Sequence, residues 1–177
     1  MTWTPNRRMA LIAAIIFVLD QLTKFLVLQF LGPTQERIVI DGFFKFVNWW
    51  NTGAAWSLFH NHNELLAVVS LLALLGLFLW RHHFDTKTIL GQISLGLIFG
   101  GILGNLYDRL IPHVDQLGQK IYGVIDFLRF YIYRRSGEEL GFPAFNVADS
   151  AICVGVGLLI ILSWKQETAF HGEKSEA

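Results

Sequence analysis

Four long apolar stretches constrain the fold of this chain more than any other feature of its sequence. They cover about residues 9–31, 65–80, 89–106 and 147–164. Each is close to the roughly 20 residues that a helix needs to cross a bilayer. Only 16% of the 177 residues are charged, compared with about a quarter in an ordinary soluble domain. The sequence therefore predicts an all-α membrane protein with four transmembrane helices in a single domain, residues 1–165.

Basic residues gather near one end of the predicted spans. Four spans bring both termini to the same side of the membrane, and the positive-inside rule makes the side rich in Lys and Arg cytoplasmic. The residues that mark this side are Arg7, Arg8, Arg81, Lys87 and Lys165. The connections over about 32–64 and 107–146 then lie on the outer side. Residues 166–177 form a short polar tail that we expect to be cytoplasmic and disordered.

A β-hairpin is predicted in the first outer connection. Strands over 38–40 and 43–47 flank Asp41-Gly42, which is typical of a tight turn. Three tryptophans that suit a membrane interface follow the second strand: Trp49, Trp50 and Trp56. Between them, the small polar stretch 51–55 is either a loop packed against the membrane or a wall of a substrate cleft, to which Asn51 offers its amide.

Two pairs of charged residues lie in or at the end of the predicted helices. Asp20 and Lys24 are four residues apart on one helix face, and charges at membrane depth are costly unless they find partners. We interpret them as an internal ion pair, because Lys24 would compensate the carboxylate and oppose a catalytic role for it. Asp108-Arg109 either marks the membrane interface, or Arg109 reaches into a cleft and Asp108 orients it.

Several other residues are interpreted as structural. Glycines recur every four positions in the third apolar stretch and allow close helix contact in lipid: Gly96, Gly100 and Gly104. The single cysteine, Cys153, excludes an internal disulfide and is interpreted as a packing residue. His82 and His83 are interpreted as interface or loop residues, so no metal site is predicted. The net charge of +0 offers no electrostatic surface for nucleic acid.

Two aspartates stand among apolar neighbours, and both are predicted on the outer side. Asp126 lies in Val124–Phe127, and Asp149 begins the fourth apolar stretch. If the fold brings the two together, they form a carboxylate pair that can share one proton and activate water for hydrolysis. The predicted topology also places Asn51 and Asn105 at this face of the membrane, which favours one common site.

Five motifs follow one another along the chain, from the first predicted span to the fourth. They are Asp20–Lys24, Asn51–Ser57, Gly104–Arg109, Val124–Phe127 and Phe145–Ser150. In this order they resemble the bacterial lipoprotein signal peptidases, also called signal peptidase II. Any one of the motifs alone would be a weak signal, whereas the ordered set covers essentially the whole chain except the tail.

The resemblance implies a peptidase of the bacterial inner membrane with a periplasmic β-cradle and a periplasmic active site. Its substrate would be a prolipoprotein that carries diacylglycerol on a cysteine, and cleavage would fall just before that cysteine. Asp126 and Asp149 would be catalytic. The substrate-binding residues would be Asn51, Asn105, Arg109 and Asn146, and the supporting residues would be Asp20, Lys24, Gly53 and Asp108. The resemblance implies no metal and no organic cofactor, contact with membrane lipid, and inhibition by the cyclic peptide globomycin.

The chain departs from compact members of that family in two segments. The stretch between Arg109 and Gly123 and the polar tip over 134–141 are longer than expected. Both aspartate motifs are intact, so the departure concerns the shape of the substrate entrance and not the catalytic pair.

The local sequence around each aspartate predicts its protonation state. Asn146 is a good N-cap for the fourth helix, so Asp149 falls in the first turn, where the helix dipole favours the charged form. Asp126 stands between Ile125 and Phe127, where desolvation favours the neutral form. We therefore expect Asp149 to be the resting base and Asp126 the resting acid.

Two other functions are compatible with acidic residues at a membrane surface. A transporter or channel subunit could relay protons through an acidic pair, but the acids cluster at one face and no inverted repeat is evident. A non-catalytic assembly protein would not need two separate aspartates in apolar surroundings. The peptidase is therefore the function that the sequence favours.

Overall fold

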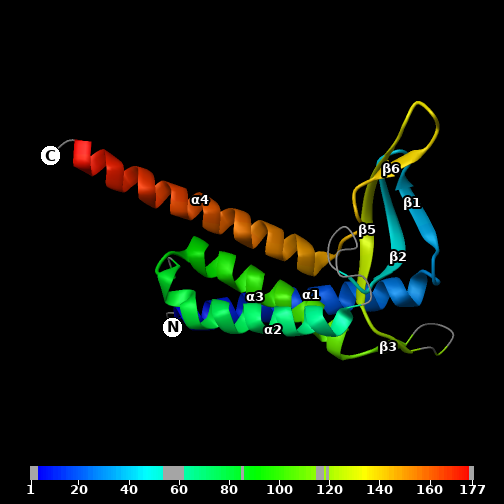
Figure 1. Cartoon of the computed structure of the whole chain (residues 1–177), viewed down its shortest axis with the longest axis horizontal. Coiled ribbons are helices and arrows are strands. Elements are labelled where there is room, and N and C mark those ends of the chain that lie inside the picture. Colours follow the sequence, from blue (N-terminus) through cyan, green and yellow to red (C-terminus); the bar gives the residue numbers. More distant parts are fainter. Residues whose placement is uncertain (1–3, 54–61, 85, 115–117, 119, 176–177) are drawn as a thin grey trace.

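The computed structural model describes residues 4–53, 62–84, 86–114, 118 and 120–175. Figure 1 shows long helices side by side, with a sheet at one end and both termini at the other. The helices are α1 (Pro5–Phe30), α2 (Asn63–Trp80), α3 (Ile89–Leu110) and α4 (Val147–Ser175), and the short helix η2 (Arg81–His83) follows α2. In the described part of the chain, four helices are long and apolar enough to cross a membrane, as the sequence predicted.

Three of the helices, α1, α3 and α4, begin or end at other residues than predicted. Helix α1 begins at Pro5, earlier than predicted, because Thr4 accepts a hydrogen bond from the backbone of Arg7 and proline suits the first helical position. Helix α3 continues to Leu110, past the predicted end at 106. The part of α4 that is apolar enough to span a membrane is Val147–Lys165, which agrees with the predicted span over 147–164. The helix itself continues to Ser175, where the sequence predicted a disordered tail. Residues 165–175 include Lys, Gln, Glu and Ala and lack proline, so nothing in them stops the helix.

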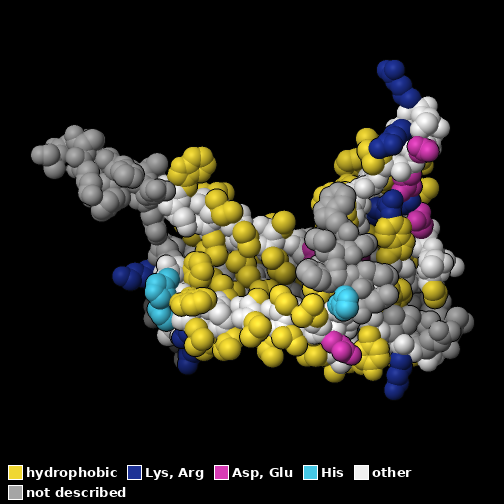
Figure 2. Space-filling view, viewed as in Figure 1, with side chains coloured by type: hydrophobic (Ala, Val, Ile, Leu, Met, Phe, Trp, Pro, Cys, Tyr) yellow, Lys and Arg dark blue, Asp and Glu magenta, His cyan; other side chains and the backbone are white. Residues whose placement is uncertain are grey.

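Helix α3 is the centre of the bundle because its glycines admit the neighbouring backbones. Gly100 lies against the Ala13 carbonyl of α1, and Gly101 lies against the Ala148 carbonyl of α4, so a β-carbon at either position would clash. This confirms the predicted role of the glycine repeat in helix packing. Helix α2 is the most exposed of the four, because only 6% of the residues in its apolar stretch are buried. Figure 2 shows apolar side chains over this helical part, as expected of a surface that faces lipid.

The sheet is larger than the predicted hairpin. Strands β1 (Glu36–Ile40) and β2 (Phe44–Asn51) form that hairpin, with Gly42 at a φ of 70° in its turn. Strands β5 (Val124–Tyr133) and β6 (Glu139–Gly141) extend it to a four-stranded antiparallel sheet in the order β1-β2-β5-β6. A separate two-stranded ladder joins β3 (His113–Val114) to β4 (Lys120–Ile121). The predicted class, four helices with a small β element, is therefore confirmed, and the second connection adds strands that its sequence pattern did not predict.

One network of ion pairs crosses all four strands of this sheet. The Lys45 ammonium on β2 lies 2.6 Å from Glu36 on β1 and 2.7 Å from Glu139 on β6. Arg129 on β5 pairs with Glu139 at 2.7 Å and lies over the Trp49 ring. Burial lowers the pKa of Lys45, but the two glutamates outweigh it and the net pKa is raised. The network therefore ties the predicted hairpin to the strands that follow α3.

Candidate active site

The two aspartates singled out in the sequence meet at one cavity. Asp126 lies near the start of β5 and Asp149 in the first turn of α4, and both line a cavity of about 920 Å³. The antiparallel register sets Trp49 opposite Asp126. Asn51, two residues further along β2, therefore lies on the same face of the sheet as Asp126. The structure thus brings residues from three separate parts of the chain to one wall of the cavity.

Asp126 is held between two amides. Its carboxylate accepts hydrogen bonds from the Asn51 side chain at 2.9 Å and from the Asn146 side chain at 2.8 Å. The residue is only 4% exposed. Burial, with a further contribution from the nearby Asp149 charge, raises the pKa of Asp126 to about 7. This carboxyl group can therefore hold a proton near neutral pH, as predicted from its apolar neighbours.

Asp149 is held by the start of its own helix and by helix α3. The Asn146 side chain accepts a hydrogen bond from the Asp149 backbone at 2.9 Å, and the Asp149 carboxylate accepts one from the Asn146 backbone at 3.2 Å. This reciprocal capping box confirms that Asn146 is the N-cap. The Asn105 amide donates to the other carboxylate oxygen at 2.7 Å. Both oxygens of Asp149, which lines the cavity, are therefore held in place by hydrogen bonds.

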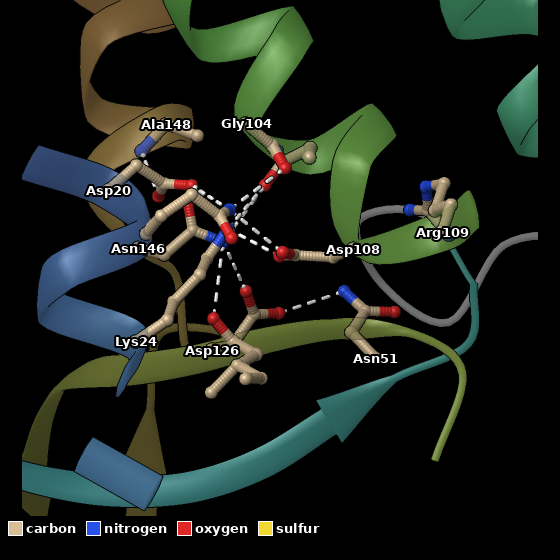
Figure 3. Close-up of polar contacts among 12 residues, drawn as sticks. Asp20, Lys24, Asn51, Gly104, Asp108, Arg109, Asp126, Asn146 and Ala148 are labelled. Carbon is tan, nitrogen blue, oxygen red and sulfur yellow. Dashed lines mark hydrogen bonds and ion pairs between the residues drawn. The ribbon is translucent and has the colours of Figure 1, made fainter. Parts of the chain in front are cut away.

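Behind the aspartates lies a fully buried charge cluster, Asp20, Lys24 and Asp108, which Figure 3 shows in close-up. The Lys24 ammonium contacts Asp20 at 2.7 Å and Asp108 at 2.5 Å. The predicted Asp20–Lys24 ion pair is thus confirmed. Lys24 also donates to the side-chain oxygen of Asn105 at 3.1 Å, which turns the side-chain nitrogen of Asn105 toward Asp149. The cluster is therefore connected to Asp149 by two hydrogen bonds that pass through Asn105.

Asp20 joins the cluster to the start of helix α4. Its second oxygen accepts a hydrogen bond from the Ala148 backbone at 2.9 Å. A carboxylate from α1 thus satisfies one of the free backbone N–H groups of the first turn of α4. A β-carbon at Gly104 would clash with the Asp20 carboxylate, so this glycine of α3 makes room for the site as well as for helix packing. Gln21, whose role the sequence did not reveal, donates to Asp108 at 2.9 Å.

Arg109 points to a different side of α3 from Asp108, so the expectation that Asp108 orients Arg109 is wrong. The Arg109 guanidinium donates to the Gly53 carbonyl at 2.8 Å and to the Asn63 side chain at 3.0 Å. It lines the same cavity as the two aspartates. Gly53 also donates its backbone N–H to the side-chain oxygen of Asn51 at 2.9 Å, and the side-chain nitrogen of Asn51 donates to Asp126.

Three further predictions concern residues around the cavity. Cys153 is exposed and lines the cavity, so its interpretation as a small packing residue is wrong. The rest of the Asn51–Ser57 motif, Trp56 included, lies outside the described residues. Among the described residues, no group of three or more His, Cys, Asp or Glu side chains is placed to hold a metal ion.

Comparison with known proteins identifies relatives over nearly the whole chain. The model of the family described as signal peptidase (SPase) II matches residues 12–165. A lipoprotein signal peptidase from Anoxybacillus flavithermus is 30% identical over 97% of this chain and 94% of its own length. One from Syntrophotalea carbinolica is 34% identical over 90% of this chain and 92% of its own length. A solved bacterial membrane enzyme superposes with a TM-score of 0.72 at 27% identity, covering 91% of this chain and 90% of its own.

Proposed function

Because the chain belongs to the signal peptidase II family, it is a bacterial membrane protease that removes signal peptides from prolipoproteins, and we propose that Asp126 and Asp149 form its catalytic pair. The observation that carries the proposal is the single cavity onto which both carboxylates open. Asn146 links them, since it caps the helix of Asp149 and donates to Asp126. An aspartic pair of this kind needs neither a metal nor an organic cofactor for amide hydrolysis.

The two aspartates have different roles in the proposed mechanism. Ionised Asp149 takes a proton from water while the water oxygen attacks the scissile carbonyl carbon. Protonated Asp126 gives its proton to the carbonyl oxygen, and a tetrahedral diol forms. Asp149 then passes its proton to the amine nitrogen, Asp126 recovers a proton from the diol, and the carbon–nitrogen bond breaks. The raised pKa of Asp126 supports its role as the resting acid.

The peptide backbone of the substrate would lie between the amides and the guanidinium of the cavity. Arg109 presents a planar group with several donors, which suits the carbonyls of an extended peptide better than a lysine would. The proposed binding residues all line the cavity or contact the aspartates: Asn51, Asn105, Arg109 and Asn146. We propose that cleavage falls just before a diacylglyceryl-modified cysteine, and that a globomycin-type cyclic peptide competes for the same space.

The architecture supports an orientation with the site outside the cytoplasm. Both termini lie at the end of the bundle away from the sheet, and the aspartates lie at the sheet end (Figure 1). The basic residues of the predicted cytoplasmic face lie in the first turn of α1, after α2 and at 165 of α4. We propose the inner membrane, a periplasmic sheet and cytoplasmic termini. The cavity wall includes apolar residues of α2 and α4, such as Leu66, Val69 and Ile152, which suits the lipid and signal peptide of a substrate.

The test is cleavage of a purified, lipidated prolipoprotein by the purified enzyme in detergent micelles. Asp126→Asn and Asp149→Asn should each lower kcat by at least about a thousandfold, since the two groups act as one unit. Glu138→Gln, at the exposed tip before β6, is the matched loss of one carboxylate and should leave turnover unchanged. Both aspartate variants should remain folded and membrane-inserted. Substantial turnover in either of them would refute the catalytic pair.

A further inference from the structure

One side chain of the segment between Arg109 and Gly123 contacts the buried charge cluster. This segment is longer than expected for compact members of the family. Helix α3 ends at Leu110, and the β3–β4 ladder follows, with His113 opposite Ile121. The His113 Nε2 atom lies 3.0 Å from an oxygen of Asp108. The imidazole is 14% exposed and packs beside the Trp50 ring, at 6.0 Å between ring centroids. His113 therefore reaches inward from outside the helices.

Asp108 is the group on which the contacts of the cluster converge. One of its oxygens faces Lys24, and the other accepts from Gln21 and contacts His113. Two carboxylates and one ammonium are buried here without exposure to water, which is costly unless further donors complete the site. The charged and titratable groups around Asp108 are Asp20 and Lys24 of α1, Arg109 of α3 and His113 of β3.

A continuous chain of contacts leads from His113 to the active site. His113 contacts Asp108, Asp108 pairs with Lys24, and Lys24 donates to Asn105. Asn105 in turn donates to Asp149 at 2.7 Å. The three donors of the Lys24 ammonium face Asp20, Asp108 and the side-chain oxygen of Asn105, so each link fixes the direction of the next polar group. A change at His113 can thus reach Asp149 through these contacts, and it can reach the cavity wall through Trp50, beside which the ring packs.

We infer that His113 is a positioning residue for the hydrolysis: by donating to Asp108 it holds Lys24 and Asn105 in place, and through them the carboxylate of Asp149. The inference rests on the proposed catalytic role of Asp149. It assigns a task in the reaction to the β3–β4 segment, which lies outside the two aspartate motifs.

The experiment separates donation from packing with two variants of the full-length enzyme in micelles. His113→Phe keeps a ring beside Trp50 but cannot donate, whereas His113→Gln loses the ring and keeps a donor at the end of the side chain. Loss of one hydrogen bond to a charged group corresponds to about a tenfold effect. We therefore expect kcat to fall about tenfold in His113→Phe with KM unchanged, and to return to within about threefold of the wild type in His113→Gln.

The reverse order, with Phe active and Gln slow, would show that the histidine only packs against Trp50 and would overturn the inference. Unchanged kcat in both variants, or a rise in KM without loss of kcat, would overturn it as well. If His113→Phe does not fold, His113→Ala takes its place as the variant without a donor. His82→Ala, on the exposed η2 helix, is the control for loss of an imidazole. Failure of the catalytic proposal would be distinct, because Asp149→Asn would then retain turnover.

Discussion

Two lysines of this molecule each lie between two carboxylates, and their surroundings differ. Lys24 contacts Asp20 at 2.7 Å and Asp108 at 2.5 Å, and all three side chains have 0% exposure. Lys45 contacts its two glutamates at 2.6 Å and 2.7 Å, but those glutamates are 38% and 27% exposed. The distances are nearly the same, so the difference between the two networks is access to water.

That difference gives the networks different tasks. Charges without water depend on one another, and removal of one leaves the others uncompensated. Partly exposed charges keep much of their hydration, so such pairs contribute little. The Lys24 cluster also continues by hydrogen bonds to Asp149 through Asn105. The Lys45 network joins four strands and lies outside the aspartate contacts. We therefore expect the first network to control activity and the second to adjust stability.

The largest effect is expected from Lys24→Met. It leaves two fully buried carboxylates without a cation, at a cost of about 3–5 kcal/mol in the free energy of unfolding. Asn105 also loses the donor that directs it toward Asp149, so cleavage should be abolished. Thermal unfolding in detergent and the cleavage assay measure the two effects. A stable and active Lys24→Met enzyme would contradict the contrast between the two networks.

The next effect depends on pH and concerns Asp126. Its pKa in the folded protein is raised from 3.8 to about 7, so the folded state binds the proton more tightly than the unfolded chain does. Stability is then lost as pH rises from about 4 to about 7. Asp126→Asn removes this loss and should raise the stability by a few kcal/mol at pH 8, with little change at pH 4. Unfolding curves of the wild type and of Asp126→Asn at the two pH values are the measurement. An equal change in stability at pH 4 and pH 8 would refute the prediction.

Gly104→Ala tests how tightly the Asp20 carboxylate is enclosed. A β-carbon there meets that carboxylate, and overpacking of this kind costs about 1–3 kcal/mol. We expect a lower unfolding temperature and slower cleavage together, because Asp20 would move away from Lys24. Gly157→Ala on α4 is the matched control, since no described heavy atom lies within 4 Å of its β-carbon position. If the two variants have the same unfolding temperature and the same cleavage rate, the buried cluster tolerates displacement of the Asp20 carboxylate, and the prediction is wrong.

The smallest effect is expected in the sheet network. Glu139→Gln should lower the free energy of unfolding by about 1 kcal/mol or less, because Glu139 is partly exposed and the buried Lys45 keeps its contact with Glu36. Its hydrogen bond with Lys45 lowers the pKa of Glu139, so this contribution is present above pH 4.5 and is lost as pH falls through the lower folded pKa. The pH dependence is therefore opposite to that of Asp126. Cleavage at neutral pH should be unchanged, and a clear loss of kcat would place the sheet network in the mechanism.

The parts of the fold that could be predicted are those governed by local pattern. A long apolar run in lipid must satisfy its own backbone hydrogen bonds, so the four spans follow from composition. The hairpin at Asp41-Gly42 and the cap at Asn146 depend on a few adjacent residues. Strand β5 was not predicted, because the apolar run that begins at Val124 becomes a strand only by pairing with β2, and that pairing is not local.

The active site divides in the same way. The apolar neighbours of Asp126 and the helix start at Asp149 could be recognised from the sequence, because each effect acts within a few residues. The partners of each charged group could not be recognised from the sequence. Asp108 and Arg109 are adjacent in sequence, but successive helical side chains point about 100° apart, so they face different neighbours. Only the packing of α1 against α3 decided that Asp108 meets Lys24, and only the course of the chain after α3 brought His113 to the same carboxylate.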